Sequence, residues 1–355
     1  MSGDEKIELC DIDAGTPREQ GEQQGERLGE QACALFGLRW RLLRLRSRIR
    51  DVDQLHAKAQ AHVEVLRSFD GDLSDELNGF ARASGLEPWQ LVILNHYTDF
   101  RDIPPDDGGC SVVYAPLVGG NVSAQTWDMH GTAEPFVTLL RLKPRDAPPV
   151  VLFTLTGCLG MTGLNAFGVS VCINNLTPND ARVGILWPAL VRRMLRERTA
   201  EAALEVLMRA QLSSGHNYLI ADRARVFNVE TTGVEKRVTF RDASAWYWHT
   251  NHYLDPELRA FEVPALSTST TCDRFETLTG KLASSTTRPA DIDALWTLLG
   301  SHDGLPRSLC SHLQGDDPAA SKTCGAIICD PTRSHILARR GCINGSSYRV
   351  VEVEA

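Results

Sequence analysis

The sequence of 355 residues has no long hydrophobic run. A membrane-spanning helix needs about 18 consecutive apolar residues, and the best stretch, residues 183–191, is interrupted by Gly184 and Pro188. The first ten residues, MSGDEKIELC, lack the basic start and apolar segment of a secretion signal. With 43% hydrophobic and 23% charged residues, the composition is that of a packed protein, and we expect a cytoplasmic one with no membrane partner.

An excess of basic residues is missing too. The chain has 37 Lys and Arg against 45 Asp and Glu, and residues 1–109 alone hold 13 basic and 21 acidic side chains. Because a nucleic-acid-binding protein needs a basic face that neutralises phosphates, no nucleic-acid partner is expected. The exception is residues 37–50, GLRWRLLRLRSRIR, with six arginines. Here Leu38, Leu42, Leu45 and Ile49 recur at helical spacing, which predicts an amphipathic helix with the arginines on its solvated sides. The alternative is a surface that recruits an anion or a substrate.

No Cys-x-x-Cys pair occurs among the ten cysteines. In a large chain without a signal sequence we expect these residues to be thiols, most of them buried, and we expect no metal site. The alternative is a metal held by His249 and His252 of the motif His-Thr-Asn-His, but no third ligand is apparent near them in the sequence.

The pattern of apolar residues changes at a turn-rich break, residues 101–109. Before it, apolar residues recur at helical spacing. After it, β-branched and apolar runs separated by turn residues indicate strands, interrupted by helices near 186–197, 200–211 and 290–302. This order predicts an α+β fold with antiparallel sheets between helical layers, rather than alternating β-α-β units. The last two long strands should form a hairpin across residues 331–334.

A glycine pair leads directly into a cysteine at Gly108-Gly109-Cys110, where the first long strand begins. Glycine adopts backbone conformations that are costly for other residues, which would let the thiol approach the carbonyl that precedes it. If the Gly109–Cys110 bond were cut, Cys110 would carry both a thiol and a free α-amine, whose pKa near 7.7–8.0 suits a base for that thiol. A cysteine at the start of a strand is common, however, and the motif alone does not establish this chemistry.

Strand pairing predicts a carboxylate beside this cysteine. If residues 118–120 form a three-residue hairpin loop, Cys110 lies directly opposite Asp128, on the same face of the sheet. Asp128 would then orient the α-amine or the thiol. With a two-residue loop the partner becomes Met129, Asp128 points to the other face, and it merely ends a strand.

Asn251 follows the aromatic run AWYW near the end of another predicted strand. The side-chain amide of an asparagine is a neutral donor suited to the oxyanion of a tetrahedral acyl intermediate. An asparagine before a turn is also common where it has no catalytic role.

Four segments, taken together, resemble the penicillin acyltransferase family of N-terminal nucleophile hydrolases of the cysteine type, which includes isopenicillin N acyltransferase and the β-alanyl amine hydrolases of insects. The segments are, in order, GGCSVVYAP, QTWDMH, GLNAFGVSVCINNL and HTNHYL. The resemblance runs over nearly the whole chain. It implies a four-layer αββα fold, with residues 1–109 as a helical leader that becomes the small subunit after self-cleavage and residues 110–355 as the catalytic large subunit.

The same resemblance implies roles for individual residues. The Gly109–Cys110 bond would be the cleavage junction and Cys110 the mature nucleophile. Asp128 would orient the new amino terminus, and Asn251 would donate to the oxyanion.

One position departs from the family pattern. Some relatives carry an arginine where this chain has Ser311, and Arg307 or His312 would then take over part of its role, unless the substrate lacks the group which that arginine meets. The side chains expected to contact substrate are His130, His216, Asn217 and His312.

These features predict a self-processing enzyme that cleaves a small-molecule amide or aminoacyl bond through an acyl-enzyme on Cys110. The first alternative is an N-acyltransferase that passes an acyl group from a coenzyme A thioester or an amide donor to an amine. The second is a non-catalytic, unprocessed homologue that binds a ligand. No cofactor is expected beyond that acyl donor. The expected partners are a small-molecule amide or amine and the two fragments of the chain itself, as a heterodimer.

Overall fold

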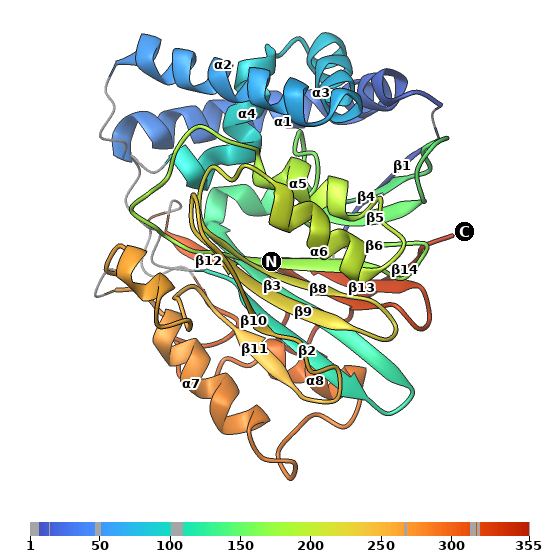
Figure 1. Ribbon diagram of the computed structural model, residues 1–355, viewed down its shortest axis with the longest axis vertical. Helices are drawn as coiled ribbons and strands as arrows, with labels where there is room; N and C mark the ends of the chain where they lie inside the picture. Colours follow the sequence, from blue (N-terminus) through green and yellow to red (C-terminus); the bar gives the residue numbers. More distant parts are fainter. Residues whose placement is uncertain are drawn as a thin grey trace.

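The computed structural model describes residues 7–13, 15–46, 51–100, 109–265, 268–312, 317 and 320–354, which form two β-sheets with helices around them (Figure 1). The larger sheet has the strand order β1 (Leu9–Ile12), β4 (Val137–Leu142), β5 (Val150–Leu155), β6 (Thr162–Asn165), β7 (Ser170–Asn175), β8 (His216–Ala221), β9 (Val226–Thr231), β10 (Lys236–Phe240). The smaller sheet has the order β11 (Tyr247–His249), β2 (Ser111–Leu117), β3 (Gly120–His130), β12 (Ser321–Asp330), β13 (His335–Arg340), β14 (Arg349–Glu352). Neighbouring strands are antiparallel except for β1 and β4, which are parallel.

The two sheets lie face to face. Along β2, Val112 and Tyr114 point between the sheets and pack with Leu219 of β8. Val113 and Ala115 point the other way, into a second apolar cluster formed with helices. This alternation is what a strand buried on both faces requires, because successive side chains point to opposite sides of the sheet.

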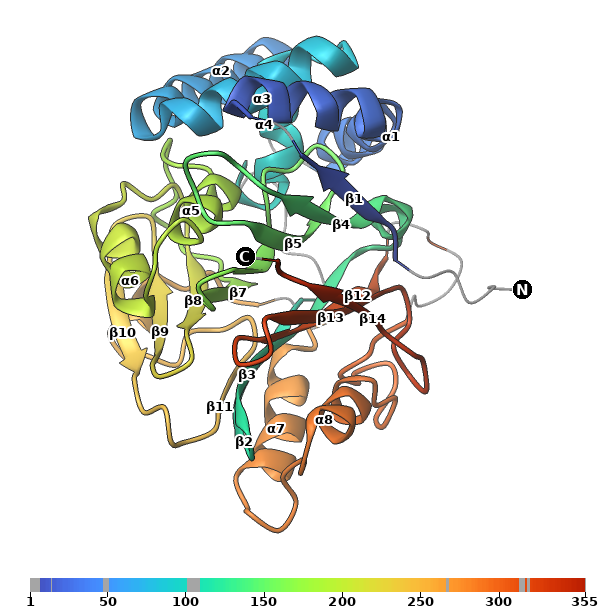
Figure 2. The same cartoon turned by 90° about the vertical axis from the view of Figure 1, so that its right-hand side faces the viewer.

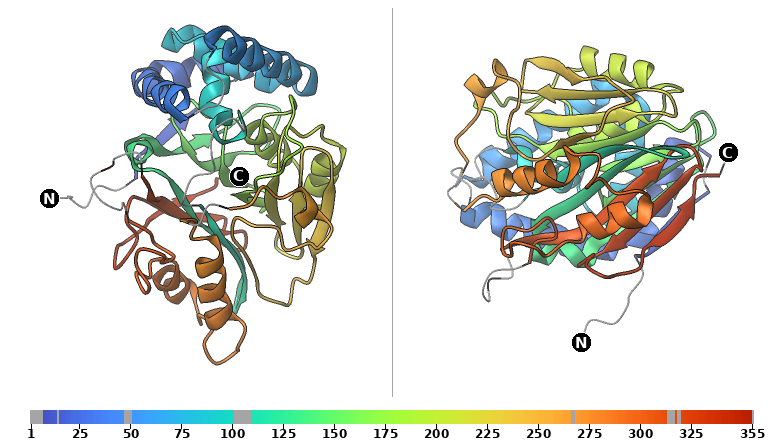
Figure 3. Two further views of the ribbon diagram at one scale, coloured as in Figure 1. Left: turned by 90° about the vertical axis from the view of Figure 1, so that its left-hand side faces the viewer. Right: turned by 90° about the horizontal axis from the view of Figure 1, so that it is seen from below.

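Helices cover the outer faces of the sandwich. α5 (Trp187–Met194) and α6 (Ala200–Arg209) lie beside the larger sheet, and α7 (Thr271–Leu282) and α8 (Ile292–Leu299) lie on the outer side of the smaller sheet (Figure 2 and Figure 3). α7 and α8 pack their leucines against β2, β3, β12 and β13. The expected four-layer αββα fold is therefore confirmed.

The N-terminal segment adds helices at one end of the sandwich (Figure 2). They are α1 (Pro17–Arg46), α2 (Val52–Phe69), α3 (Gly71–Ser84), α4 (Pro88–His96) and a short 3₁₀ helix, η1 (Tyr97–Phe100). Gly85 ends α3 with a left-handed φ of 78°, and Pro88 is the first residue of α4, positions that glycine and proline favour at helix ends.

The arginine-rich end of α1 buries a different face from the predicted one. Leu43 is buried, whereas Leu45, part of the predicted apolar stripe, is 77% exposed. Arg39 also lies on the buried face, where its guanidinium donates to the Leu94 carbonyl and lies 5.0 Å from the ring centre of Tyr97. An arginine is stable there because the carbonyl and the ring replace the water around its charge. The end of the run, residues 47–50, lies outside the described residues.

The leader and the sandwich share one core. β1 pairs with β4, and Ile7, Ile12 and Leu94 belong to the same apolar cluster as Leu139 and Leu152 of the larger sheet. Among the described helices, none combines the length and the apolar character needed to cross a membrane.

The loop between β2 and β3 is shorter than predicted. Leu117 pairs with Gly120, so the loop consists of Val118 and Gly119, and the three-residue loop is wrong. Gly119 has a φ of 95°, in the left-handed region that glycine adopts without strain, and this permits the tight reversal.

The corrected register does not set Asp128 opposite Cys110. The β2–β3 ladder ends where Ser111 pairs with Thr126, and Cys110 lies just before it. Asp128 pairs instead with Thr323 of β12, next to an irregularity in the β12–β3 register. Whatever brings the thiol and the carboxylate together is therefore not direct cross-strand pairing.

Candidate active site

A pocket lies between the leader and the sandwich, and Gly109, Cys110, Asp128 and Asn251 are all among its lining residues. One wall comes from the end of α4 and from η1. Most of the other lining side chains are apolar; they include Leu94, Trp127, Met129, Leu155, Met161, Ile173, Trp187 and Val263. The three residues selected from the sequence for catalysis thus meet in one place, although their chain positions span 141 residues between Cys110 and Asn251.

Cys110 is almost completely buried, with 4% of its surface exposed. Burial, with a smaller contribution from the Asp128 carboxylate, raises the pKa of its thiol to about 12; the Asp128 backbone N–H, Arg274 and Gln125 act in the opposite direction. The thiol is therefore protonated at neutral pH in the intact chain. It needs a base before it can act as a nucleophile.

Asp128 is the buried carboxylate next to this thiol. Its Oδ1 accepts a hydrogen bond of 2.7 Å from Thr323 Oγ1. Burial raises the pKa of Asp128 to about 6, while Arg274, Thr323 and the Gly109 N–H keep it from rising further. At neutral pH the group is ionised, and it is placed to hold a positively charged amine at the position of Cys110.

Asn251 lies directly against the residue that precedes the nucleophile. A Cβ atom added to Gly109 would lie 2.1 Å from Asn251 Oδ1, a distance at which something must move. Asn251 Oδ1 accepts from Arg274 at 2.9 Å, and its Nδ2 donates to the Asn175 carbonyl at 3.0 Å. These two bonds fix the plane of the amide, and its second Nδ2 hydrogen remains available to another acceptor.

Arg274, on α7, completes the group, and the sequence analysis did not select it. It is fully buried. Its Nη1 donates to the Cys110 carbonyl at 2.9 Å, its Nη2 to Asn251 and its Nε to Thr270 Oγ1 at 3.0 Å. Its positive charge lowers the pKa of both Cys110 and Asp128, so it favours negative charge at this end of the pocket.

A sequence signal for Arg274 exists but is weak. Arg274 shares the buried face of α7 with Leu278 and Leu282, four and eight residues further on. The helix itself was not predicted because it begins within the segment STSTTC, whose Ser and Thr residues are common in turns. The substitute expected for the family arginine, Arg307, instead pairs with Asp273 at 2.6 Å and does not line the pocket.

A chain of buried amides holds the Cys110 carbonyl from the other side. Asn174 Nδ2 donates to that carbonyl at 2.7 Å, Asn217 donates to Asn174 at 2.9 Å, and Asn228 donates to Asn217 at 2.6 Å. All three are fully buried. Because each bond orients the next amide, the chain fixes the backbone of the nucleophile. Asn217, expected to contact substrate, is therefore part of this internal chain and does not line the pocket.

Of the other three expected substrate contacts, His216 lines the pocket, with its Nε2 3.4 Å from Asp99 Oδ1. His130 is fully buried and its Nδ1 bonds Thr132 Oγ1 at 2.7 Å, away from the pocket lining. His312 also lies outside the pocket lining.

The two histidines of the His-Thr-Asn-His motif do not form a metal pair. The Nε2 of His249 bonds Glu230 at 2.7 Å, and its Nδ1 bonds the Thr250 carbonyl at 2.7 Å. Both ring nitrogens of His249 are thus engaged, and its ring lies 6.4 Å from that of His252.

Comparison with known proteins gives a family match. Residues 119–324, more than half of the chain, match the family described as acyl-coenzyme A:6-aminopenicillanic acid acyl-transferase. No curated protein matches the chain in sequence.

Several solved structures are similar at low sequence identity. An N-acylethanolamine-hydrolyzing acid amidase ortholog from Caenorhabditis elegans is 12% identical with a TM-score of 0.42, over 63% of this chain and 93% of that one. A variant of conjugated bile acid hydrolase from Clostridium perfringens is 10% identical with a TM-score of 0.46, over 69% and 97%. Penicillin V acylase from Agrobacterium tumefaciens is 14% identical with a TM-score of 0.36, over 65% and 82%. At these values the matches do not bear on substrate or mechanism.

Proposed function

Because the chain belongs to the acyl-coenzyme A:6-aminopenicillanic acid acyl-transferase family, we propose that it is a self-processing N-terminal nucleophile hydrolase that cleaves an amide bond of a small molecule. One observation carries the proposal. The buried thiol of Cys110, at a Gly-Cys junction, shares a pocket with the carboxylate of Asp128 and the amide of Asn251.

In the processing step, the Cys110 sulfur attacks the carbonyl carbon of Gly109. The carbon–sulfur bond forms, the peptide carbon–nitrogen bond breaks, and the nitrogen takes up the proton that the thiol gives up. Water then hydrolyses the thioester, which leaves a carboxylate on Gly109 and both a thiol and an α-amine on Cys110. The absence of room for a Cβ on Gly109 explains why glycine is needed beside Asn251.

The mature enzyme repeats this chemistry on a substrate. The α-amine of Cys110, close to its ordinary pKa near 7.7–8.0, accepts the thiol proton, and Asp128 stabilises the resulting ammonium. The thiolate attacks the substrate carbonyl, and Asn251 Nδ2 donates to the oxyanion. The leaving amine takes up the proton, and water releases the acyl group from the sulfur.

The substrate carbonyl takes the place that Gly109 occupies before cleavage. The same sulfur attacks both carbonyls, so both must lie beside the same amide; Asn251 Oδ1 is the nearest atom to a Cβ added to Gly109, which places the Asn251 amide beside that residue. The apolar lining of the pocket beyond this point suits an apolar acyl group.

After cleavage, we expect the two fragments to remain together as a heterodimer. The leader supplies β1 to the larger sheet, part of the shared core and one wall of the pocket. Separating the fragments would expose this apolar surface to water.

Acyl transfer is the second candidate, and the description of the family favours it. An amine would then replace water as the acceptor of the acyl group, or a coenzyme A thioester would replace the amide as its donor. Both reactions would pass through the same acyl-enzyme. Adding an amine acceptor during turnover distinguishes the two, because only a transferase forms the new amide in preference to the free acid.

Intact mass spectrometry tests the proposal. The wild-type protein should give two masses, for residues 1–109 and 110–355, and a thiol-reactive acyl probe should label the larger fragment at its first residue. Cys110→Ala should remain a single chain without amide hydrolysis. The control is Cys272→Ser, which removes an exposed thiol of α7 and should process normally. An active protein that stays uncut would refute the proposal; an uncut and inactive wild type would favour the non-catalytic alternative.

A further inference from the structure

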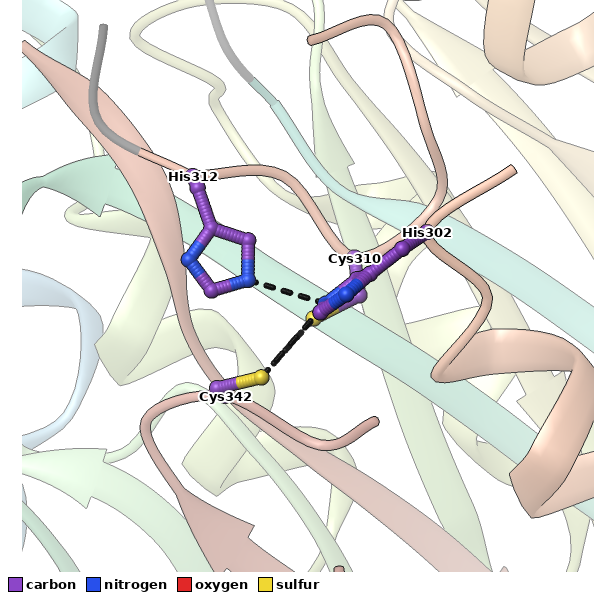
Figure 4. A group of neighbouring side chains, drawn as sticks. All are labelled: His302, Cys310, His312 and Cys342. Atoms are coloured by element: carbon purple, nitrogen blue, oxygen red, sulfur yellow. Dashed lines mark hydrogen bonds between the residues drawn. The ribbon is translucent and has the colours of Figure 1, made fainter. Parts of the chain in front are cut away.

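Four side chains outside the pocket converge on one point (Figure 4). We call them the loop cluster: His302, Cys310, His312 and Cys342. They come from three separate segments, one after α8, one before β12 and one after β13. One ligand atom from each lies within 4.8 Å of all the others.

Three of the distances between these atoms are known individually; the sulfur–nitrogen and sulfur–sulfur distances are close to the edges of a tetrahedron around a metal ion, and the distance between the two ring nitrogens is shorter. His312 Nε2 lies 2.9 Å from His302 Nε2, Cys342 Sγ lies 3.5 Å from His302 Nε2, and Cys310 Sγ lies 3.9 Å from Cys342 Sγ. With zinc–sulfur bonds of about 2.3 Å and zinc–nitrogen bonds of about 2.0 Å, the ligand atoms of a tetrahedral site lie about 3.3 to 3.8 Å apart.

We propose that the loop cluster binds one zinc ion, with the two thiolates and the two Nε2 atoms as its four ligands. On binding, the two thiols each release a proton, so that their two negative charges balance the charge of the ion. Two thiolates and two imidazoles in a tetrahedral arrangement select zinc rather than magnesium or calcium, which prefer oxygen ligands.

The surroundings of the ligands support this assignment. Cys310 is fully buried and the other three ligands are half-buried, so the ion would lie at the edge of the core with little contact with water. A disulfide between Cys310 and Cys342 would need a sulfur–sulfur distance of about 2.05 Å, whereas the two sulfur atoms lie 3.9 Å apart, so they are not bonded to each other.

The ion would have a structural role. Its four positions are filled by protein ligands, which leaves none open for a substrate or a water. None of the four residues lines the pocket. The ion would tie together three connections at the outer end of the smaller sheet, where the chain between α8 and β12 has little regular structure in its described part.

Hydrogen bonds connect the site to the pocket. Ser311, between two of the ligands, donates its N–H to Thr323 Oγ1 at 2.8 Å, and Thr323 donates to Asp128. If the proposed function holds, loss of zinc should therefore loosen the support of the Asp128 carboxylate as a secondary effect.

Elemental analysis of the protein, purified under reducing conditions without chelator, tests the inference. The wild type should contain about one zinc per chain. Cys342→Ser and His302→Ala, which change the less buried ligands, should lose it, whereas Cys33→Ser, which changes a half-buried thiol of α1, should retain it. After metal removal, added cobalt(II) should give the visible absorption of a tetrahedral thiolate site in the wild type and in Cys33→Ser only.

Cys110→Ala separates this inference from the proposed function. It should keep the full zinc content whether or not the chain processes itself, because none of the four ligands lines the pocket that holds the junction. Wild-type protein that carries no zinc and shows no thiolate–cobalt absorption would overturn the inference. Peptide mapping that finds a disulfide between Cys310 and Cys342 would overturn it as well.

Discussion

The pocket and the loop cluster both contain buried cysteines, but the groups around the sulfur atoms differ. Near Cys110 there are a carboxylate, several side-chain amides and a guanidinium, and the pocket lies beside them. In the loop cluster, two sulfur atoms and two ring nitrogens face one another. The first arrangement lies beside a pocket, while in the second the four ligand atoms lie within 4.8 Å of one another. The difference shows that burial of a cysteine does not indicate its role; the chemistry and direction of its neighbours do.

The two regions are nevertheless connected. Thr323 of β12 accepts a hydrogen bond from Ser311 in the loop cluster's segment and donates one to Asp128 in the pocket. A variant of either region should therefore be tested in both ways. Turnover reports on the pocket, and metal content reports on the loop cluster.

Asn251→Ala is expected to give the largest difference between an effect on the pocket and an effect on the loop cluster. Loss of one oxyanion donor typically costs about 2.7–4 kcal/mol of the barrier, so turnover should fall by about 100- to 1,000-fold while zinc content stays unchanged. Steady-state kinetics on processed protein provides the measurement. The matched control is Asn344→Ala, an exposed asparagine. A decrease of less than tenfold would remove Asn251 from the proposed mechanism.

A somewhat smaller effect is expected for Arg274→Lys. The lysine keeps the charge but cannot donate at once to Cys110, Asn251 and Thr270, and each charge-assisted bond contributes about 1.5–3 kcal/mol. Turnover should fall by about 100-fold, and thiol alkylation should become slower at a given pH. Arg307→Lys is the control, since Arg307 pairs with Asp273 away from the pocket lining. Equal losses in both variants would mean that Arg274 acts on the fold alone.

A gain in stability, and not a change in turnover, is expected for Asp128→Asn, made in the uncut Cys110→Ala background. The pKa of Asp128 rises from 3.8 to about 6 on folding, so the folded protein holds this proton more tightly than the unfolded chain. The free energy of unfolding is therefore highest below about pH 4 and decreases as the pH rises through about 6. An asparagine avoids that loss, and its advantage in the free energy of unfolding should grow over this interval to about 3 kcal/mol at pH 8, at 1.36 kcal/mol per pKa unit.

Chemical denaturation at pH 4 and pH 8 measures this difference. The exposed Asp303→Asn serves as a control and should show no such pH dependence. An equal effect of Asp128→Asn at both pH values would show that folding does not raise the pKa of this carboxyl group.

Much of the fold follows from local sequence. The strands around the β12–β13 turn were predicted, and Asp330 pairs with His335 as expected, because alternating apolar residues and a Pro-containing turn act over a few residues. The short β1 and β14 were missed, since four residues carry little pattern and are held by the strands beside them. The family resemblance drawn from four separated motifs is confirmed by the family match.

The sequence predicted only part of the site. Cys110, Asp128 and Asn251 were selected, and all three line one pocket, yet the strand register used to place Asp128 was wrong by one residue. Their catalytic roles stay predictions. The choice succeeded because ordered motifs reflect the fold as a whole, whereas a register depends on the exact turn at Gly119.

The sequence by itself determined the layers, the Gly-Cys junction and the residue types available for chemistry, because these depend on local patterning and composition. Only the tertiary structure decided that Arg274 reaches the Cys110 carbonyl and that His302, Cys310, His312 and Cys342 meet. Those contacts join residues up to 164 positions apart, and no local pattern records such distances. They arise when sheets and helices pack into one core, which fixes the directions of side chains that the sequence leaves independent.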